Sequence, residues 1–121
     1  MLLATINKSR QLLYLTFVAH VGAEELRRWQ KEMPSLISEL NAGFLVLTDL
    51  GRLDSIEPAC APIIGEVMEL CDHKGVSLVL RVIPDSSKDI GLNILSLFHY
   101  RRQPRVVTCK DMVEAAKTLS L

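Results

Sequence analysis

Two unbroken apolar segments constrain the fold more strongly than any other feature of the sequence. GFLVLTDL (43–50) and VSLVLRVIP (76–84) lack the alternation of a strand that has one wet face. Such runs are typical of strands covered on both faces, as in the parallel sheets of α/β proteins. A stretch with helical periodicity lies between them. We therefore expect two parallel strands joined by a right-handed helical crossover.

The other segments continue this alternation of strands and helices. Residues 2–6 and 12–20 flank the polar turn NKSRQ and predict an antiparallel hairpin. Amphipathic periodicity predicts helices at 23–40, 59–75, 85–102 and 111–121, and RVVTC predicts a last strand at 105–109. The expected order is ββαβαβαβα. This is an α/β fold with a mostly parallel sheet of four to five strands, one antiparallel strand and four main helices.

The chain has no visible linker, repeat or low-complexity tract, so residues 1–121 are expected to form a single domain. Pro34 interrupts the first helical pattern. Because proline lacks an amide donor and clashes with the preceding turn, we expect a kink there or two short helices. Pro62 is expected in the first turn of its helix, where a missing N–H costs little.

Charge and composition argue against several classes of function. Fourteen lysines and arginines balance 14 aspartates and glutamates. This balance gives no attraction to nucleic acid or to an anionic membrane, and little repulsion between copies that would oppose a homodimer. No signal peptide or bilayer-length apolar run is present, so a cytoplasmic protein is expected. The odd set of Cys60, Cys71 and Cys109 is expected to be reduced and buried.

The sequence contains no recognisable catalytic constellation. It has neither a GxSxG elbow nor a glycine-rich phosphate loop. His20, His73 and His99 are scattered, and nothing in the sequence places one of them beside a serine or cysteine. Cys71 and His73 diverge on a helix and would chelate poorly. We therefore predict a protein that is not an enzyme, with no catalytic residue, cofactor or metal.

Two polar segments follow predicted strands. LDSIEP (53–58) follows the first buried strand and PDSSKD (84–89) follows the second. The carboxyl ends of parallel strands meet at one edge of a sheet, which is where open α/β sheets bind ligands. Ordinary turn and helix-capping chemistry is the alternative reading of both segments.

The stretch VLTDLGRLDSIEPACAPIIGEVMELCDHKG, followed by VSLVLRVIPD, resembles the STAS domain of bacterial anti-sigma-factor antagonists and the related STAS and CRAL-TRIO-like group. The resemblance covers nearly the whole chain. In those antagonists an Asp-Ser-Ser-Gly motif opens a helix, and a partner kinase phosphorylates its first serine, which turns partner binding off. The resemblance implies a partner-binding surface made of Asp54, Ser55, Glu57, Pro58, Ser86, Ser87 and Lys88.

Spacing bears on whether this switch is retained. Aligning Asp49-Leu50 and Gly75 without a gap puts Glu57 in the aspartate slot and Pro58, which has no hydroxyl, in the serine slot. Using Ser55 as the phosphoacceptor requires a compensating insertion. We therefore interpret LDSIEP as a turn, with Pro58 at the first helical position.

Three functions follow as hypotheses. The first is a non-enzymatic STAS-like interaction and regulatory module that binds an unidentified protein partner and lacks the phosphoserine switch. The second is a module that binds a small apolar ligand or lipid. That function would require the apolar segment IGLNILSLF (90–98) to line a cavity, whereas a domain of this size is expected to use it for packing. The third is an anti-sigma-factor antagonist switched by phosphorylation of Ser55.

Overall fold

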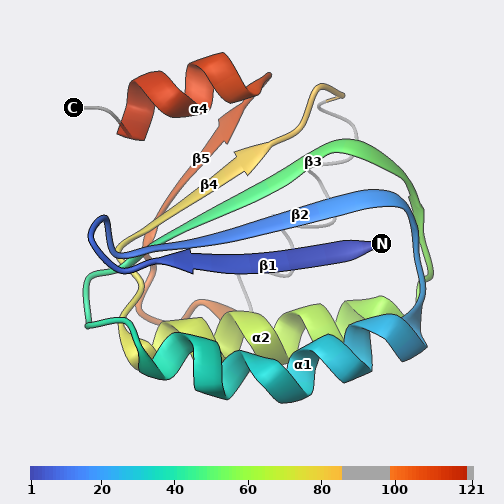
Figure 1. Ribbon diagram of the computed structural model, residues 1–121, viewed down its shortest axis with the longest axis horizontal. Helices are drawn as coiled ribbons and strands as arrows, with labels where there is room; N and C mark the ends of the chain where they lie inside the picture. Colours follow the sequence, from blue (N-terminus) through green and yellow to red (C-terminus); the bar gives the residue numbers. More distant parts are fainter. Residues whose placement is uncertain (86–98, 120–121) are drawn as a thin grey trace.

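The computed structural model describes residues 1–85 and 99–119 (Figure 1). Strands β1 (Leu2–Asn7) and β2 (Leu12–Val21) form the antiparallel hairpin that the sequence predicts. The Asn7 side chain holds the turn between them, because its Oδ1 accepts hydrogen bonds from the Ser9 hydroxyl at 2.8 Å and the Arg10 amide at 3.2 Å.

Three more strands complete a five-stranded sheet: β3 (Leu45–Ile56), β4 (Leu78–Val82) and β5 (Arg105–Cys109). The strand order in the sheet is β1-β2-β3-β4-β5, and only the β1–β2 pair is antiparallel. The predicted α/β class, the mostly parallel sheet and the single antiparallel strand are confirmed.

Helices cover both faces of this sheet. Figure 1 shows α1 (Ala23–Ser38) and α2 (Cys60–Lys74) side by side on one face and α4 (Met112–Leu119) on the other. The described residues thus hold three of the four predicted helices. The fourth, at 85–102, falls mainly on residues 86–98, which lie outside the described part of the chain. At its described ends, Asp85 lies in a bend and Arg101 and Arg102 lie in a turn rather than in a helix.

Each side of the sheet has its own core, which explains the unbroken apolar runs. On β3, Val46 joins the larger cluster beneath α1 and α2, whereas its neighbour Leu47 joins the smaller cluster beneath α4. Since successive side chains of a strand point to opposite faces, a strand covered on both sides needs apolar residues at consecutive positions.

The helix α1 runs through Pro34 without a break, so the alternative of two short helices is wrong. Pro34 is exposed, on the face opposite the buried Met33 and Ile37. Because Pro34 has no N–H, the backbone carbonyl one turn earlier in α1 lacks its helical donor. That carbonyl is on the side of the helix close to water, which can donate to it instead. Burial of the other face then holds the helix together.

As predicted, Pro62 lies in the first turn of α2, and Gly75 ends that helix with φ of +96°.

The predicted turn at LDSIEP is wrong, because β3 continues to Ile56. The reason lies in β2, which is also long and follows β3 through two register shifts, so that His20 pairs with Ser55 and Val21 with Ile56. Ala19 at the second shift has a positive φ of 57°, a backbone conformation that permits the bulge. Pro58 stands two residues before α2, not at its first position.

Candidate functional site

Four residues of the predicted partner surface lie at the carboxyl ends of β2 and β3. Asp54 and Ser55 lie near the end of β3. Glu57 and Pro58 belong to the short connection from β3 to α2. All four side chains are exposed, and all four also line one large hollow in the protein, so they form its rim. The other three predicted members, Ser86, Ser87 and Lys88, lie outside the described residues.

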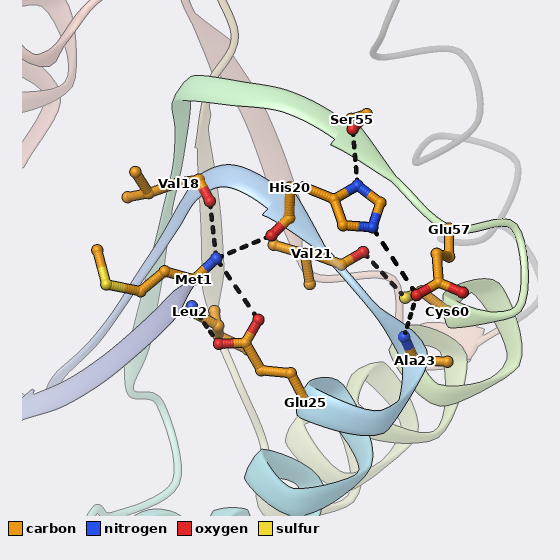
Figure 2. Close-up of polar contacts among 10 residues, drawn as sticks. All are labelled: Met1, Leu2, Val18, His20, Val21, Ala23, Glu25, Ser55, Glu57 and Cys60. Carbon is orange, nitrogen blue, oxygen red and sulfur yellow. Dashed lines mark hydrogen bonds and ion pairs between the residues drawn. The ribbon is translucent and has the colours of Figure 1, made fainter.

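The rim contains a polar cluster that the sequence did not indicate. The imidazole of His20 lies between Ser55 and Glu57, with Nδ1 2.7 Å from Ser55 Oγ and Nε2 3.8 Å from Glu57 Oε1 (Figure 2). Nothing in the sequence places a histidine beside a serine, but the fold does. His20 and Ser55 are partners across the β2–β3 pair, which brings together side chains 35 positions apart in the chain.

Glu57 joins this cluster to the start of α1. Its Oε1 accepts the Ala23 amide at 3.2 Å, and its own amide donates to the Val21 carbonyl at 3.1 Å. An amide at a helix N-terminus lacks an intrahelical acceptor, so the Glu57 carboxylate serves as a cap from outside the helix. Gly22 makes this possible, since a Cβ there would overlap the Glu57 carboxylate.

The irregular end of β2 is held from its other side by the first residue. The Met1 ammonium donates to the carbonyls of Val18 at 2.8 Å and His20 at 2.9 Å, and lies 3.5 Å from Glu25 Oε1 (Figure 2). Glu25 also accepts the Leu2 amide at 3.1 Å. Met1 and Val18 thereby continue the β1–β2 register by one pair, and these contacts help to fix the backbone that carries His20.

The hollow beneath this rim has a volume of about 590 Å³. It lies between the sheet, α1 and α2. Most of its wall is apolar, with side chains from three strands and both helices: Leu15, Phe17, Trp29, Val46, Leu50, Leu53, Ile56, Cys60, Ala61, Ile64, Val67, Met68, Cys71 and Val79. Its size is within the roughly 300–1,000 Å³ of small-molecule sites. Residues 90–98 lie outside the described part of the chain, so the expectation that they pack rather than line a cavity stays a prediction.

A few polar side chains interrupt the apolar wall. Arg81 is only 2% exposed and lies beside Thr48 in the β3–β4 register. Burial raises the pKa of Tyr100, an effect that the nearby Arg81 opposes in part. Trp29 is 8% exposed, and its Nε1 has no hydrogen-bond partner among the described residues. The mostly apolar wall therefore includes two buried donor side chains: Arg81, which already interacts within the protein, and Trp29, whose nitrogen is shielded from solvent.

None of the three cysteines is suited to act as a nucleophile. All are reduced and buried, as predicted. Burial raises the pKa of Cys60, with the Glu57 carboxylate acting in the same direction, and raises the pKa of Cys71 to about 12. Since the thiolate is the reactive form, both thiols stay neutral and unreactive near pH 7.

A second, smaller hollow of about 270 Å³ lies at the other end of α2. Here His99 Nδ1 lies 2.8 Å from Glu69 Oε1, and the buried Asp72 accepts the Arg102 amide at 3.1 Å. Gly65 gives the His99 ring its space. Basic and acidic groups are mixed around this hollow, which gives it no clear ligand preference. No group of side chains in residues 1–85 and 99–119 is arranged to hold a metal ion.

The comparison with solved structures relates this geometry to known proteins. An uncharacterised protein of the DUF3478 family from Shewanella loihica PV-4, which has a SpoIIAA-like fold, matches with a TM-score of 0.74 over 98% of this chain and 93% of its own, at 13% identity. This chain has a SpoIIAA-like fold. The anti-sigma factor antagonist SpoIIAA in its unphosphorylated form matches with a TM-score of 0.62 at 11% identity, over 99% of this chain and 98% of its own.

SpoIIAA from Bacillus in its phosphorylated form matches with a TM-score of 0.63 at 9% identity, over 98% of this chain and 99% of its own. The predicted resemblance to STAS domains is thus confirmed at the level of the fold. No protein-family model matches the sequence, and no curated protein sequence does. Among the described residues, no helix has the length and apolar character needed to cross a bilayer.

Sequence reasoning missed the residues that the sheet brings to the site from other elements. His20 ends a strand without any local motif, and Trp29 has the spacing of an ordinary core residue. The only local signal was Arg81, a charged residue inside the apolar run VSLVLRVIP. A buried charge has to be compensated, so its presence in a covered strand points to a polar site.

Proposed function

We propose that this chain is a non-enzymatic STAS-like interaction and regulatory module that binds a protein partner without a phosphoserine switch. The observation that carries the proposal is the gathering of Asp54, Ser55, Glu57 and Pro58 on one exposed rim of a SpoIIAA-like fold. Ser86, Ser87 and Lys88 complete the proposed surface. A single domain over residues 1–121, a cytoplasmic location and, as the alternative partner, a second copy of the chain belong to the same proposal.

Two features support the absence of the switch. Ser55 lies within β3, and its hydroxyl contacts His20 rather than the free amides of a helix N-terminus. The residues from Glu57 to Ala61, which lead into α2, carry no hydroxyl group. The entrance to α2 therefore has no side-chain hydroxyl that a kinase could phosphorylate.

The partner surface is tested by comparing the wild-type protein with Asp54→Lys, which reverses a charge on the rim. The matched control is Glu32→Lys, which reverses an exposed charge on α1, away from the rim. Chemical crosslinking and mass spectrometry in the native host should give one partner that is lost in Asp54→Lys and kept in Glu32→Lys. A partner that binds both variants equally would place the interface elsewhere.

The switch is tested by intact-mass analysis and peptide mapping of the protein isolated from the same cells. We expect no phosphate on Ser55. A phosphorylated peptide that includes Ser55, absent in Ser55→Ala, would establish the alternative of a switched anti-sigma-factor antagonist.

A second function is favoured by the hollow: binding of a small apolar ligand or lipid. A domain of 121 residues can spare little of its core, yet the described residues line a hollow of about 590 Å³ beneath the rim. Native mass spectrometry of the gently purified protein tests this function. A bound small molecule supports it, and loss of that molecule from Ile64→Trp, which fills the hollow, assigns it to this site.

A further inference from the structure

Strand β1 is an edge of the described sheet, with β2 as its neighbour. The Val18 amide donates to the Met1 carbonyl, and the Met1 ammonium donates to the Val18 carbonyl. Since the backbone groups of a strand alternate in direction, the N–H and C=O groups of Leu2, Ala4 and Ile6 point away from β2. Within the described part of the chain, the amides of Ala4 and Ile6 have no partner. The edge therefore presents unpaired donors and acceptors.

This edge lacks the features that usually protect an exposed strand. Natural sheets block edge pairing with charged side chains, proline, bulges or a covering segment. The β1 sequence LLATIN contains no charge and no proline, and its register with β2 is unbroken. Its core-facing side chains are apolar and only partly buried, and Leu3 on the other face is 51% exposed. The composition of β1 thus favours pairing with another strand.

One flank of α1 runs along this edge, in the same direction as β1 (Figure 1). Glu25 accepts the Leu2 amide at 3.1 Å near the start of β1, and Glu39 lies 2.9 Å from Lys8 beyond its end. The strand from Leu2 to Lys8 and the helix from Glu25 to Glu39 each span about 20 Å. The two elements are therefore level with one another over their whole length.

Two opposite charges lie on this flank of α1. Arg28 and Glu32 follow Glu25 at intervals of three and four residues, which places all three on one side of the helix. Gln30, on the other flank, contacts Glu66 of α2. Both Arg28 and Glu32 are exposed, and neither forms an ion pair with another described residue. Each charge is therefore available to a neighbouring molecule.

A second copy of the chain matches both elements at once. Antiparallel pairing of two β1 strands centred on Ala4 would bond each Ala4 to the other, and each Ile6 amide to the opposite Leu2 carbonyl. Ala4 lies about 7 Å beyond Leu2, the rise of about four to five helical residues. The two-fold axis would therefore pass midway between Arg28 and Glu32 and set each Arg28 opposite a Glu32.

We propose that two copies of this chain associate through their β1 edges, in an antiparallel pairing centred on Ala4, with Arg28 of each copy paired with Glu32 of the other. Because α1 packs against both β1 and β2, the two α1 helices lie about 10 Å apart, an ordinary distance for packed helices. The zero net charge of the chain opposes this association little. The inference assigns the second copy, the alternative partner in the proposed function, to the β1 edge rather than to the rim.

Sedimentation velocity of the full chain at about 1–500 µM tests the association. We expect a monomer–dimer equilibrium with a Kd of about 1–100 µM, as for other small interfaces. A protein that stays monomeric over this range would overturn the inference. That outcome includes the case in which the edge accepts a strand from a different protein.

Charge reversal tests the contact between the helices. Arg28→Glu and Glu32→Arg each set like charges opposite one another at two symmetric places, so each should raise the dimer Kd about tenfold. An equimolar mixture of the two variants restores opposite charges at both places and should form a heterodimer with the wild-type Kd. The matched control is Arg27→Glu, an exposed position on the flank toward α2, which should leave the Kd unchanged. A wild-type Kd for both single variants would overturn the proposed interface.

Disulfide crosslinking tests the register. In the Ala4-centred pairing, Leu3 of one copy faces Thr5 of the other in a non-hydrogen-bonded pair, with Cα atoms about 4.5 Å apart. A mixture of Leu3→Cys and Thr5→Cys should therefore crosslink on oxidation, whereas either variant alone should crosslink far less. The native cysteines are buried and do not interfere. Equal crosslinking in all three samples would overturn this register.

These results are independent of the rim. A monomeric protein would remove the self-association and leave the proposed partner surface standing. Conversely, Glu32→Lys should weaken self-association and still keep a partner that depends on Asp54. Failure of the inference and failure of the proposed function are therefore distinguishable.

Discussion

The hydroxyl of Ser55 lies 2.7 Å from Nδ1 of His20, across the paired ends of β2 and β3. Both residues are exposed, and 59% of the His20 side chain is accessible to water. Water competes for hydrogen bonds at such a position, so the bond contributes little to folding. Its role is to orient two side chains on the rim.

This position leads to the first prediction. In a double-mutant cycle of Ser55→Ala and His20→Asn, the coupling free energy measured by urea unfolding should stay below about 1 kcal/mol. A coupling above about 2 kcal/mol would show instead that the pair stabilises the β2–β3 extension.

Gly65 carries the second prediction. A Cβ at this position would lie 2.8 Å from Cε1 and 2.9 Å from Cδ2 of His99, so a whole ring has to move. Replacing a helical glycine by alanine usually gains about 1 kcal/mol. Here we expect Gly65→Ala to lower the free energy of unfolding by about 1–3 kcal/mol, as in other overpacked sites.

The control for this prediction removes the ring. In a His99→Ala background the clash is absent, so Gly65→Ala should stabilise the protein by its helix propensity. If Gly65→Ala stabilises the wild-type protein as well, the contact between α2 and His99 is looser than described. Urea unfolding of the four proteins checks both statements.

Pro34 gives the third prediction. It lies in the interior of α1 and on its exposed side, where it removes one backbone hydrogen bond. Pro34→Ala restores that bond and should raise the free energy of unfolding by up to about 3 kcal/mol. Pro62→Ala is the matched control and should change stability little, because first-turn amides have no intrahelical acceptor. Thermal unfolding measures both, and a lower Tm for Pro34→Ala would speak for a required bend at this position.

The pKa of Cys71 supports a fourth prediction. Burial, and to a lesser degree the charge of Asp72, raise it from 9.0 to about 12 in the folded protein. Between these values the unfolded chain loses the thiol proton and the folded chain keeps it. Stability is therefore complete below pH 9 and falls as the pH rises toward 12, by at most about 1.4 kcal/mol per pH unit.

Cys71→Ala should be less stable than the wild-type protein at pH 8, because it leaves a small cavity, but should show a shallower decline between pH 9 and 11. Urea unfolding at several pH values gives both slopes. Parallel slopes for the two proteins would mean that the thiol ionises equally in the folded and unfolded states.

The sequence predicted the sheet well because its signals are local. The unbroken apolar run around Val46 requires two covered faces, and the two cores provide them. The turn at LDSIEP was mispredicted because nothing within that segment shows that β2 bends to accompany it. The deciding residue is Ala19, 34 or more positions away, whose positive φ allows the second register shift.

The site was predictable only in part, for a similar reason. The rim residues Asp54, Ser55, Glu57 and Pro58 are contiguous and follow a strand, so topology alone assigns them to one edge. His20 and Trp29 reach the site through pairing and packing across different elements. Such contacts depend on register and helix position, which a single sequence does not encode in any short motif.

The order of the strands in the sheet repeats their order along the chain. Each new strand finds its neighbour already in position, so the architecture is compatible with growth from one side to the other and needs no late insertion between finished strands. Entropy lost in closing each connection is correspondingly modest. Each parallel pair still has to close a long crossover first, so the chain should refold more slowly than a helical bundle of the same size.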